Sequence, residues 1–314
     1  MIVTVTPNPS LDRTLHLPIL EPGAVNRATS TMTEPSGKGV NVALALHGTG
    51  IDVRAVLPVG GGTGHEVIAG LDELGLPTIG VPIAGAVRSN VSLVEADGRS
   101  TKVNEPGPVL SVGEVDALCA AALSVGGEGD WVLWAGSLPA GFDADRLAGA
   151  VADARRAGRR VALDASGTAL ARVLANDRDG LPHLIKPNAD ELAEMLGTTL
   201  RTVGDVTAAA RTLLARGVST VLVSLGGDGA LLVDEHLPEA LHGTARADRV
   251  VNTVGAGDAF LAGFLAVPSG GAEGLANALR FGATAVEHDG TLLGVPDPHR
   301  SVHIGPASAD ARLS

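Results

Sequence analysis

The stretch Asn252-Thr-Val-Gly-Ala-Gly-Asp-Ala-Phe-Leu-Ala-Gly-Phe-Leu265 places two glycines and an acid directly before an apolar run of helical length. Glycines ahead of a helix let backbone N–H groups converge on an anion at the helix N-terminus. A carboxylate there can also take a proton from an attacking hydroxyl while the N–H groups hold the developing charge. Asp258 is therefore a candidate general base. The alternative is that Asp258 only complements the helix dipole.

Two further loops follow short apolar runs that we expect to be strands. Ser224-Leu-Gly-Gly-Asp-Gly229 would lie where open α/β sheets bind ligands, or it forms an ordinary hairpin turn. Lys186-Pro-Asn-Ala-Asp-Glu191 ends a strand in a lysine that would point toward phosphates. Asn188 and Glu191 offer oxygen atoms suited to Mg²⁺ through water, and they also match a helix capping box. These two interpretations of the pair are compatible.

A fourth loop, Glu34-Pro-Ser-Gly-Lys-Gly-Val-Asn41, places a lysine between glycines ahead of a helix. It is not a Walker A loop, because Gly39 follows the lysine where Ser or Thr is required. Lys38 and Asn41 would be the side chains that bind a phosphate in this pocket. The alternative is a solvated surface loop.

Short apolar runs alternate with longer amphipathic stretches along most of the chain. We expect strands at 2–6, 51–57, 131–135, 160–164, 183–186 and 220–224. We expect helices at 40–47, 65–74, 113–123, 144–156, 189–196, 203–216, 258–266 and 272–289. This alternation predicts βαβ units and a mostly parallel sheet that is covered on both faces.

Two segments, 13–33 and 87–105, break this alternation with short β-like pieces. The second resembles a hairpin around Ala96-Asp-Gly98, which is a favourable turn sequence. We expect both to project as a small lid from a single α/β domain of residues 1–300. The alternative is a peripheral extension of the sheet without a function. The polar residues 301–314 are expected to form a loose tail.

Composition excludes several classes of function. The chain has 314 residues, with 35 acidic and 23 basic side chains and a net charge of −12, which disfavours binding to nucleic acid or to an anionic membrane. Aromatic residues make up 2% of the chain, so stacking on bases is nearly excluded. No signal peptide or apolar run of membrane-spanning length is present, so we expect a cytoplasmic protein. Any anionic ligand must be met by a local cluster of cations.

In order and spacing, these segments resemble the ribokinase/PfkB carbohydrate kinases, from residue 2 to about residue 295. The chain is most similar to the branch of 1-phosphofructokinases and tagatose-6-phosphate kinases. The matching pieces are Thr6–Thr14, Arg88–Asn90, Asn104–Pro108, Gly136–Pro139 and Leu184–Asn188. Ser36, Ala140 and Ala259-Phe260 depart from the usual residues of that branch. The resemblance implies a ribokinase-like, three-layer, doubly wound sheet with a small β-sheet lid.

The resemblance also implies an activity: transfer of a phosphoryl group from ATP, with Mg²⁺, to a ketose phosphate. Fructose 1-phosphate, converted to fructose 1,6-bisphosphate, is the expected substrate. Alternatives are a tagatose-6-phosphate kinase, a PfkB-type 6-phosphofructokinase, a kinase of neutral sugars or nucleosides, and a sugar-phosphate sensor without catalysis. The expected partners are these small molecules and a second copy of the chain, bound through the lid.

Residue roles follow from the same resemblance. Asp258 would be the general base, and the backbone of Gly255, Ala256 and Gly257 would form the anion hole. The substrate would be bound by Asp12, Arg27, Gly37, Lys38, Asn41, Arg88, Asn90 and Ser137. The nucleotide would be bound by Lys186, Ser224, Gly226, Gly227, Gly229, Thr253, Gly255 and Gly257. Asn188 and Glu191 would position Mg²⁺ through water.

Overall fold

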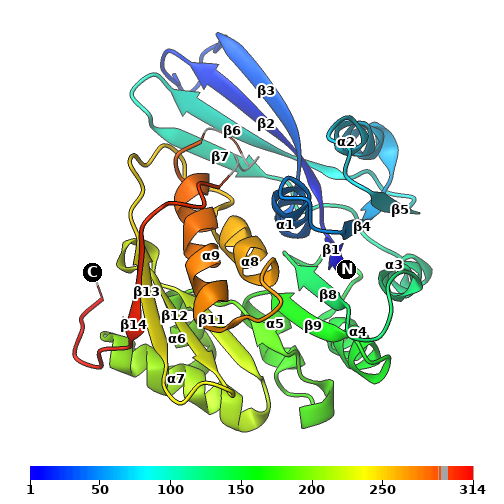
Figure 1. The fold of residues 1–314 in the computed structure, drawn as a ribbon. Helices are drawn as coiled ribbons and strands as arrows, with labels where there is room; N and C mark the ends of the chain where they lie inside the picture. Colours follow the sequence, from blue (N-terminus) through cyan, green and yellow to red (C-terminus); the bar gives the residue numbers. More distant parts are fainter. Residues whose placement is uncertain (289, 291–295, 314) are drawn as a thin grey trace.

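The computed structural model describes residues 1–288, 290 and 296–313, and in this part of the chain ten strands form one large sheet (Figure 1). Their spatial order is β14-β13-β12-β11-β10-β9-β8-β1-β4-β5. The strands are β1 (Ile2–Val5), β4 (Val53–Val59), β5 (Thr78–Pro82), β8 (Trp131–Ala135), β9 (Arg160–Asp164), β10 (Leu184–Ile185), β11 (Thr220–Ser224), β12 (Ala230–Asp234), β13 (Leu241–Ala245) and β14 (Val302–Pro306). Neighbours from β5 to β11 pair in parallel, while β12, β13 and β14 join by antiparallel pairing.

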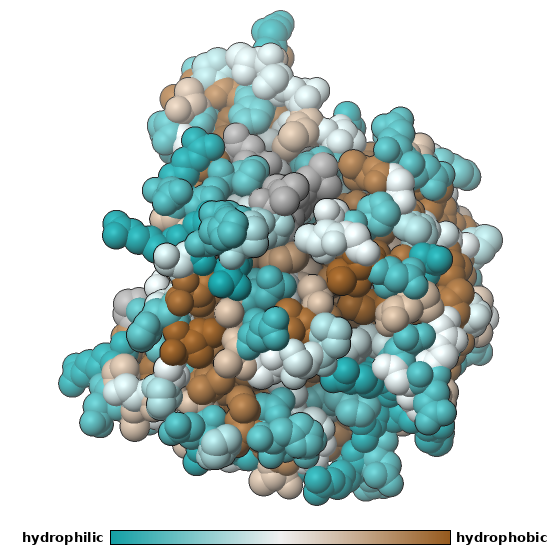
Figure 2. Space-filling view, viewed as in Figure 1, coloured by the Kyte–Doolittle hydropathy of each residue, from teal (hydrophilic) through white to brown (hydrophobic). Residues whose placement is uncertain are grey.

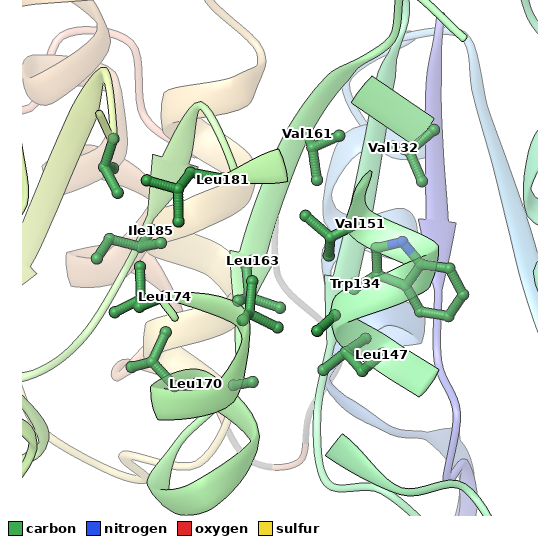
Figure 3. Packing of buried hydrophobic residues seen from close by; sticks show 14 of the residues in the cluster. Val132, Trp134, Leu147, Val151, Val161, Leu163, Leu170, Leu174, Leu181 and Ile185 are labelled. Atoms are coloured by element: carbon green, nitrogen blue, oxygen red, sulfur yellow. The ribbon is translucent and has the colours of Figure 1, made fainter. Parts of the chain in front are cut away.

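Apolar side chains on both faces of the strands give the fold its three layers. In β8, Val132 and Trp134 belong to one buried cluster, while Leu133 and Ala135 belong to the other. Successive side chains of a strand point to opposite faces, so a strand that is apolar throughout needs cover on both. Figure 3 shows the first cluster, where Trp134 packs near Leu147 and Val151 of a covering helix.

Helices supply that cover, and each layer has its own core. The layer that contains the first cluster comprises α3 (Val112–Ser124), α4 (Ala144–Arg156), α5 (Gly167–Val173), α6 (Ala189–Leu196) and α7 (Val203–Arg216). The opposite layer comprises α1 (Lys38–His47), α2 (Gly61–Glu73), α8 (Ala256–Leu265) and α9 (Gly271–Ala285). Short 3₁₀ turns, η1 (Arg178–Gly180) and η2 (Gly226–Asp228), complete the helical elements that the structure describes. The predicted three-layer sheet is confirmed.

A second, four-stranded sheet lies beside the layer of helices that contains α1 and α2 (Figure 1). It consists of β2 (Ser10–Leu17), β3 (Ser30–Ser36), β6 (Arg88–Glu95) and β7 (Ser100–Asn104), in the order β3-β2-β6-β7. The predicted hairpin at Ala96-Asp-Gly98 joins β6 to β7. The two segments that broke the helix–strand alternation therefore form this separate small sheet, whose role as a lid remains a prediction.

The strand order reverses beside β1, and this reversal places the loops that matter. The chain runs outward from β1 to β4 and β5, returns to β8 on the other side of β1, and continues through β9, β10 and β11. Loops at the carboxyl ends of strands diverge at such a point and leave a crevice for ligands. The segments after β1, β8, β9, β10 and β11 all meet at this edge.

The prediction of a loose tail at 301–314 is wrong for residues 302–313. Val302–Pro306 forms β14, which pairs antiparallel with β13. Further on, the carbonyls of Ala311 and Ala309 accept hydrogen bonds from the N–H groups of Val203 and Gly204, at 2.8 and 3.1 Å. The first N–H groups of a helix lack partners within the helix, and here the C-terminal segment supplies acceptors for α7. Ser314 lies outside the described residues.

Most of the other predicted boundaries of helices and strands agree with the structure or differ from it by one to four residues. The predicted helix at 258–266 begins instead at Ala256, and the helix expected at 272–289 ends at Ala285, with Asp289 outside the described residues. The strands β5 and β13 and the helix α5 were not predicted from the sequence, and β12 was expected only under the hairpin alternative for Ser224–Gly229. None of the helices in the described part of the chain is long and apolar enough to cross a bilayer. Hydrophilic residues are spread over the face in Figure 2, with hydrophobic residues in smaller groups among them.

The contact between the C-terminal segment and α7 can be tested by adding a single methyl group. A Cβ atom at Gly204 would lie 2.7 Å from the carbonyl oxygen of Ala309, so Gly204→Ala must displace the segment. The control is Gly149→Ala in α4, where the nearest atom is the tip of Arg146 at 3.9 Å. Thermal unfolding should show that Gly149→Ala stabilises by about 0.5–1 kcal/mol, the usual gain in helix propensity, whereas Gly204→Ala does not.

Limited proteolysis should also cut Gly204→Ala faster than the unchanged protein after residue 306. Equal stabilisation by both substitutions, with unchanged proteolysis, would show that the segment does not rest on α7 as described.

Candidate active site

Two adjoining cavities occupy the edge of the large sheet. The smaller, of about 370 Å³, is lined by Ser10, Asp12, Ser36, Gly37, Lys38, Asn41, Arg88, Asn90, Lys186, Asn188, Glu191, Ser224, Val254, Gly255, Gly257 and Asp258. The larger, of about 1260 Å³, extends over the hairpin after β11 and along α8 and α9. Asn188, Ser224 and Gly257 line both, so the two cavities meet at these residues. This geometry suits two ligands placed end to end.

Asp258 lies in the first turn of α8 and faces the smaller cavity. The side chain is buried, and its Oδ2 accepts a hydrogen bond of 2.8 Å from Nδ2 of Asn41. Burial, together with the negative charge of Asp164, raises the pKa of Asp258 to about 6, although Asn41, Lys186 and Lys38 act in the opposite direction. A carboxyl group with such a pKa is ionised at neutral pH and yet accepts a proton more readily than an ordinary aspartate.

Lys38 begins α1 and enters the cavity because the glycines on either side let α1 approach β1. Gly37 has a φ of 127°, and a Cβ there would lie 2.7 Å from Cγ2 of Thr6. At Gly39, a Cβ would lie 2.4 Å from Oγ1 of Thr6 and 2.9 Å from the carbonyl oxygen of Val5. Any larger residue would push α1 away from the sheet. The glycine–lysine–glycine sequence therefore places an ammonium group at the carboxyl end of β1.

A network of short hydrogen bonds joins β2 to β6 on the small sheet. Oδ1 of Asp12 accepts from Oγ of Ser10 at 2.7 Å and from Nδ2 of Asn90 at 2.9 Å, and Asn90 also donates to Ser10 at 3.0 Å. The Oδ1 atom of Asn90 is buried and has no partner in the described structure. All three side chains line the smaller cavity, so carboxylate and amide oxygens are available there for the hydroxyls of a sugar.

Arg88 begins β6 and supplies a second cation to the smaller cavity. Its two terminal nitrogens donate to the backbone carbonyls of Glu105 (3.0 Å) and Asn8 (3.2 Å). Its Nε is buried without a partner in the described structure. No ion pair to Arg88 is formed among the described residues, so its charge remains available to an anionic ligand.

A buried aspartate links the two lysines of the site. Asp164 ends β9, and its side chain is 1% exposed. Its Oδ1 lies 3.0 Å from Nζ of Lys38, and its Oδ2 lies 3.4 Å from Nζ of Lys186. Burial alone would raise the pKa of Asp164, but the charges of Lys186 and Lys38 outweigh burial and hold that pKa below its usual range. This carboxylate was missed in the sequence, where an acid ending an apolar strand was the available signal.

Asn188 and Glu191 form a capping box at the start of α6. The side chain of Asn188 accepts from the N–H of Glu191 at 2.8 Å, and the Glu191 carboxylate accepts from the N–H of Asn188 at 2.9 Å. The capping interpretation is thus confirmed. Both residues also line the smaller cavity, so the position expected for a role near a metal ion is compatible with capping.

The loop Ser224–Gly229 both turns the chain and lines a cavity. It joins β11 to the antiparallel β12, so the interpretation as a hairpin turn is confirmed. The same loop borders the larger cavity, opposite small and apolar residues of the last helices, namely Ala256, Phe260, Leu279, Ala283 and Val286. Backbone groups on one side and an apolar surface on the other suit a flat base with attached phosphates.

Most of the residues expected in the site line one of the cavities. In the smaller lie Asp12, Gly37, Lys38, Asn41, Arg88, Asn90, Lys186, Glu191, Gly255 and Asp258, and in the larger lie Gly226, Gly227, Gly229, Thr253 and Ala256, while Asn188, Ser224 and Gly257 line both. Arg27 and Ser137 line neither cavity. Arg27 lies in the exposed connection between β2 and β3, and Ser137 is exposed and accepts a hydrogen bond from Asn8. The expectation that both contact the substrate therefore stays a prediction.

Known proteins resemble this chain over most of its length. The 1-phosphofructokinase of Haloferax volcanii is 40% identical over 90% of this chain and 88% of its own, and that of Xanthomonas campestris pv. campestris is 39% identical over 84% and 83%. Among solved structures, phosphofructokinase-2 from Escherichia coli in complex with fructose-6-phosphate is 31% identical, with a TM-score of 0.82 over 90% of this chain and 91% of its own. The model of the pfkB family of carbohydrate kinases matches residues 8–297. The chain therefore belongs to the pfkB family of carbohydrate kinases and is an ATP-dependent sugar kinase.

Proposed function

We propose that this kinase is a 1-phosphofructokinase, which transfers the γ-phosphoryl group of ATP to the 6-hydroxyl of fructose 1-phosphate. The observation that carries the proposal is the make-up of the smaller cavity. Asp258 lies on α8, next to the point where the smaller cavity meets the larger one, whereas Arg88 lies on the small sheet. A ketose phosphate fits this polarity, with its free hydroxyl at Asp258 and its phosphate at the opposite end of the cavity, near Arg88.

The cations of the smaller cavity favour an acceptor that already carries a phosphate. Neither a neutral sugar nor a nucleoside would need Arg88, whose buried Nε has no partner in the described structure. An arginine binds a phosphate through several N–H groups, and a lysine adds a point charge. The names of the relatives at 39 and 40% identity favour fructose 1-phosphate over the 6-phosphates. Asp12 and Asn90 would bind hydroxyl groups of the sugar.

The chain's own residues account for the movement of the proton and the charge. The oxygen of the 6-hydroxyl forms a bond to the γ-phosphorus, the bond from that phosphorus to the bridging oxygen of ADP breaks, and the hydroxyl proton passes to the Asp258 carboxylate. Asn41 orients that carboxylate through its hydrogen bond to Oδ2. The first N–H groups of α8 have no acceptors within the helix, so they can hold the negative charge on the transferred group.

The larger cavity would hold the nucleotide, with its phosphates directed toward Gly257 and Ser224, where the cavities meet. Lys186 lies beside this junction, because a Cβ placed on Gly257 would be 3.4 Å from its Nζ. Placing the ammonium group there counters the charge of the transferred phosphoryl group, which such reactions require more than covalent help. We propose the cytoplasm as the location of the enzyme, because ATP is supplied there.

Mg²⁺ would be held mainly by the nucleotide phosphates and by water. The described residues contain no group of three or more acidic, histidine or cysteine side chains that could hold a metal ion by themselves. Mg²⁺ in kinases commonly keeps several waters and uses only one or two carboxylates. Glu191 fits this pattern, because Oε2 caps α6 and Oε1 accepts no hydrogen bond from the described residues, so it can meet a metal-bound water. When bound, the ion would neutralise charge on the phosphates.

We also propose that the enzyme is a homodimer through the small sheet. Every residue of β7, at one edge of that sheet, is exposed, and Val103 is 57% exposed. An uncovered strand edge is open to pairing with another chain, and a second copy would cover it. In this arrangement the small sheet would serve both as a lid over the sugar and as the interface.

The choice of substrate is tested by a coupled ADP assay with fructose 1-phosphate, fructose 6-phosphate and tagatose 6-phosphate. We expect the highest kcat/KM with fructose 1-phosphate, because its phosphate and its free 6-hydroxyl match the two ends of the cavity. A higher kcat/KM with either 6-phosphate would instead identify the chain as a 6-phosphofructokinase or a tagatose-6-phosphate kinase. If none of the three supported ADP formation, the remaining alternatives would be a kinase of neutral sugars or nucleosides and a sensor without catalysis.

The role of Asp258 is tested by the pH dependence of the reaction. The base must be ionised, and the pKa of Asp258 is raised to about 6. We therefore expect kcat/KM to be constant near neutral pH and to fall tenfold per pH unit as the pH drops below about 6. Asp258→Asn keeps the shape but cannot accept the proton, and should lower kcat by roughly 10²–10⁴-fold while ATP binding is retained. Near-normal turnover by that variant would remove Asp258 from the mechanism.

The role of Arg88 is tested by Arg88→Ala, with Arg13→Ala as a matched control. Arg13 is an exposed residue of β2 in the same sheet. Because Arg13 directly follows Asp12 in the strand, its side chain lies on the face of the sheet opposite to Asp12 and the cavity. Loss of charge-assisted hydrogen bonds of about 1.5–3 kcal/mol should raise the KM for the sugar phosphate roughly 10–100-fold, with a smaller change in kcat. The KM for ATP should not change. Equal effects of the two substitutions would contradict a phosphate site at Arg88.

A further inference from the structure

Asp164 holds two lysines that come from different parts of the fold. Lys38 opens α1, Lys186 follows β10, and Asp164 ends β9 between them. Oδ1 of the carboxylate lies 3.0 Å from Nζ of Lys38, and Oδ2 lies 3.4 Å from Nζ of Lys186. A single side chain therefore sets the separation of two ammonium groups that line the smaller cavity.

Asp164 itself does not line either cavity. Its side chain is 1% exposed and lies behind the lysines, whose own side chains are 39% (Lys38) and 6% (Lys186) exposed. A carboxylate in this position touches the cations and not a ligand in the cavities. Its influence on the reaction must act through the groups that it holds.

The charges explain why a buried carboxylate is needed there. Two ammonium groups close together repel each other, and a buried charge without a partner, such as that of Asp164 or Lys186, is strongly destabilising. The negative charges of Asp164 and Asp258 balance the positive charges of Lys38 and Lys186, so the net charge of these four groups is zero. The Asp164 carboxylate balances the charge of the two ammonium groups near the junction of the cavities, where an anionic ligand can meet them.

We propose that Asp164 is a positioning residue for phosphoryl transfer: it fixes Lys38 on the acceptor side and Lys186 on the nucleotide side so that their ammonium groups flank the transferred group. The proposal rests on the proposed kinase function. Removing the carboxylate leaves both lysines in the site but no longer fixes the distance between their ammonium groups. The enzyme then still attracts its anionic substrates, while the alignment needed during transfer is lost.

The charge of Asp164 also acts on the general base. Asp258 is faced by Asp164, Lys186 and Lys38 and is hydrogen-bonded to Asn41. After burial, the charge of Asp164 is the main cause that raises the pKa of Asp258. Neutralising Asp164 should therefore lower the pKa of Asp258 and weaken it as a base. A purely structural residue would not produce this effect.

The kinetic test is Asp164→Asn, which keeps the shape and removes the charge. We expect kcat to fall roughly 10–100-fold, as expected for a lost hydrogen bond between charged groups. The KM for ATP and for the sugar phosphate should not rise, because the cavity becomes more positive. The acidic limb of the kcat/KM profile should move to lower pH. A folded variant with unchanged kcat and an unchanged acidic limb would overturn the proposal.

Asp130→Asn is the matched control. Asp130 is partly buried and pairs with the N-terminal amine at 2.8 Å and with Arg159 at 3.8 Å. It directly precedes β8, at the amino end of that strand and so away from the cavities. Loss of the Asp130 charge should lower the unfolding temperature without shifting the pH dependence of kcat/KM. A shift of the acidic limb in Asp130→Asn equal to that in Asp164→Asn would show a general loss of structure and would contradict the positioning role.

A second measurement does not depend on turnover. Burial lowers the pKa of Lys38, but Asp164, Asp258 and Glu191 together outweigh burial and raise it, and Asp164 contributes most among the three. In Asp164→Asn the Lys38 amine should therefore lose its proton more easily and react faster with an acylating reagent at pH 8. Lys102 on β7 has the same surroundings in the variant and in the unchanged protein, whether or not a second copy covers β7, so it is the internal reference. An unchanged ratio of labelling at Lys38 to labelling at Lys102 would contradict the ion pair.

The two measurements separate the proposal from the kinase function. A protein without activity on any fructose phosphate would disprove the function, and the labelling ratio would still decide whether Asp164 holds Lys38. If Asp164→Asn does not fold, the double variant Asp164→Asn/Lys38→Met restores one acid and one base and should fold again. A double variant as unstable as the single one would overturn the proposal.

Discussion

The structure depends on keeping four charged side chains together at a buried edge of a sheet. Lys38, Lys186, Asp164 and Asp258 come from α1, the end of β10, the end of β9 and α8. Taking a charge out of water is costly unless an opposite charge accompanies it. Because the charges of these four groups cancel, the fold can bury three of the four side chains and still contain two cations and a base. The arrangement is stable only when all four elements meet.

The rest of the fold makes that meeting possible. The reversal of strand order beside β1 opens the crevice, and glycines at positions 37 and 39 let α1 approach closely enough for Lys38 to reach Asp164 at 3.0 Å. Continuous apolar strands, covered by helices on both faces, provide a rigid base for these short loops. Small errors in the placement of reacting groups are costly in catalysis, so a rigid base has direct value for phosphoryl transfer.

The sequence predicted those parts of the site that belong to local patterns. Lys38 and Asp258 lie beside glycines at helix starts, and Lys186 ends an apolar strand ahead of a proline, so each has a neighbourhood that indicates a site. Asp164 has no such neighbourhood, because its role arises from lysines that are 126 and 22 residues away in the chain. The C-terminal strand was missed for a related reason. Val302–Pro306 is held by backbone pairing at the sheet edge, which leaves little trace in its side chains.

A protein with a net charge of −12 can bind two anions because attraction at the site is local. Exposed charges more than about 10 Å apart are largely screened by salt, whereas buried ones are not. The acidic surface therefore has little influence inside the cavities, where Lys38, Lys186 and Arg88 act at short range in a medium of low dielectric constant. The balance within the buried cluster adds a second consequence. Under the proposed function, a phosphoryl group that approaches Lys38 and Lys186 would meet cations already paired with a carboxylate, so its binding in the ground state would stay moderate. The strongest interaction is then available for the charge that develops during transfer, which is the condition for binding energy to increase kcat.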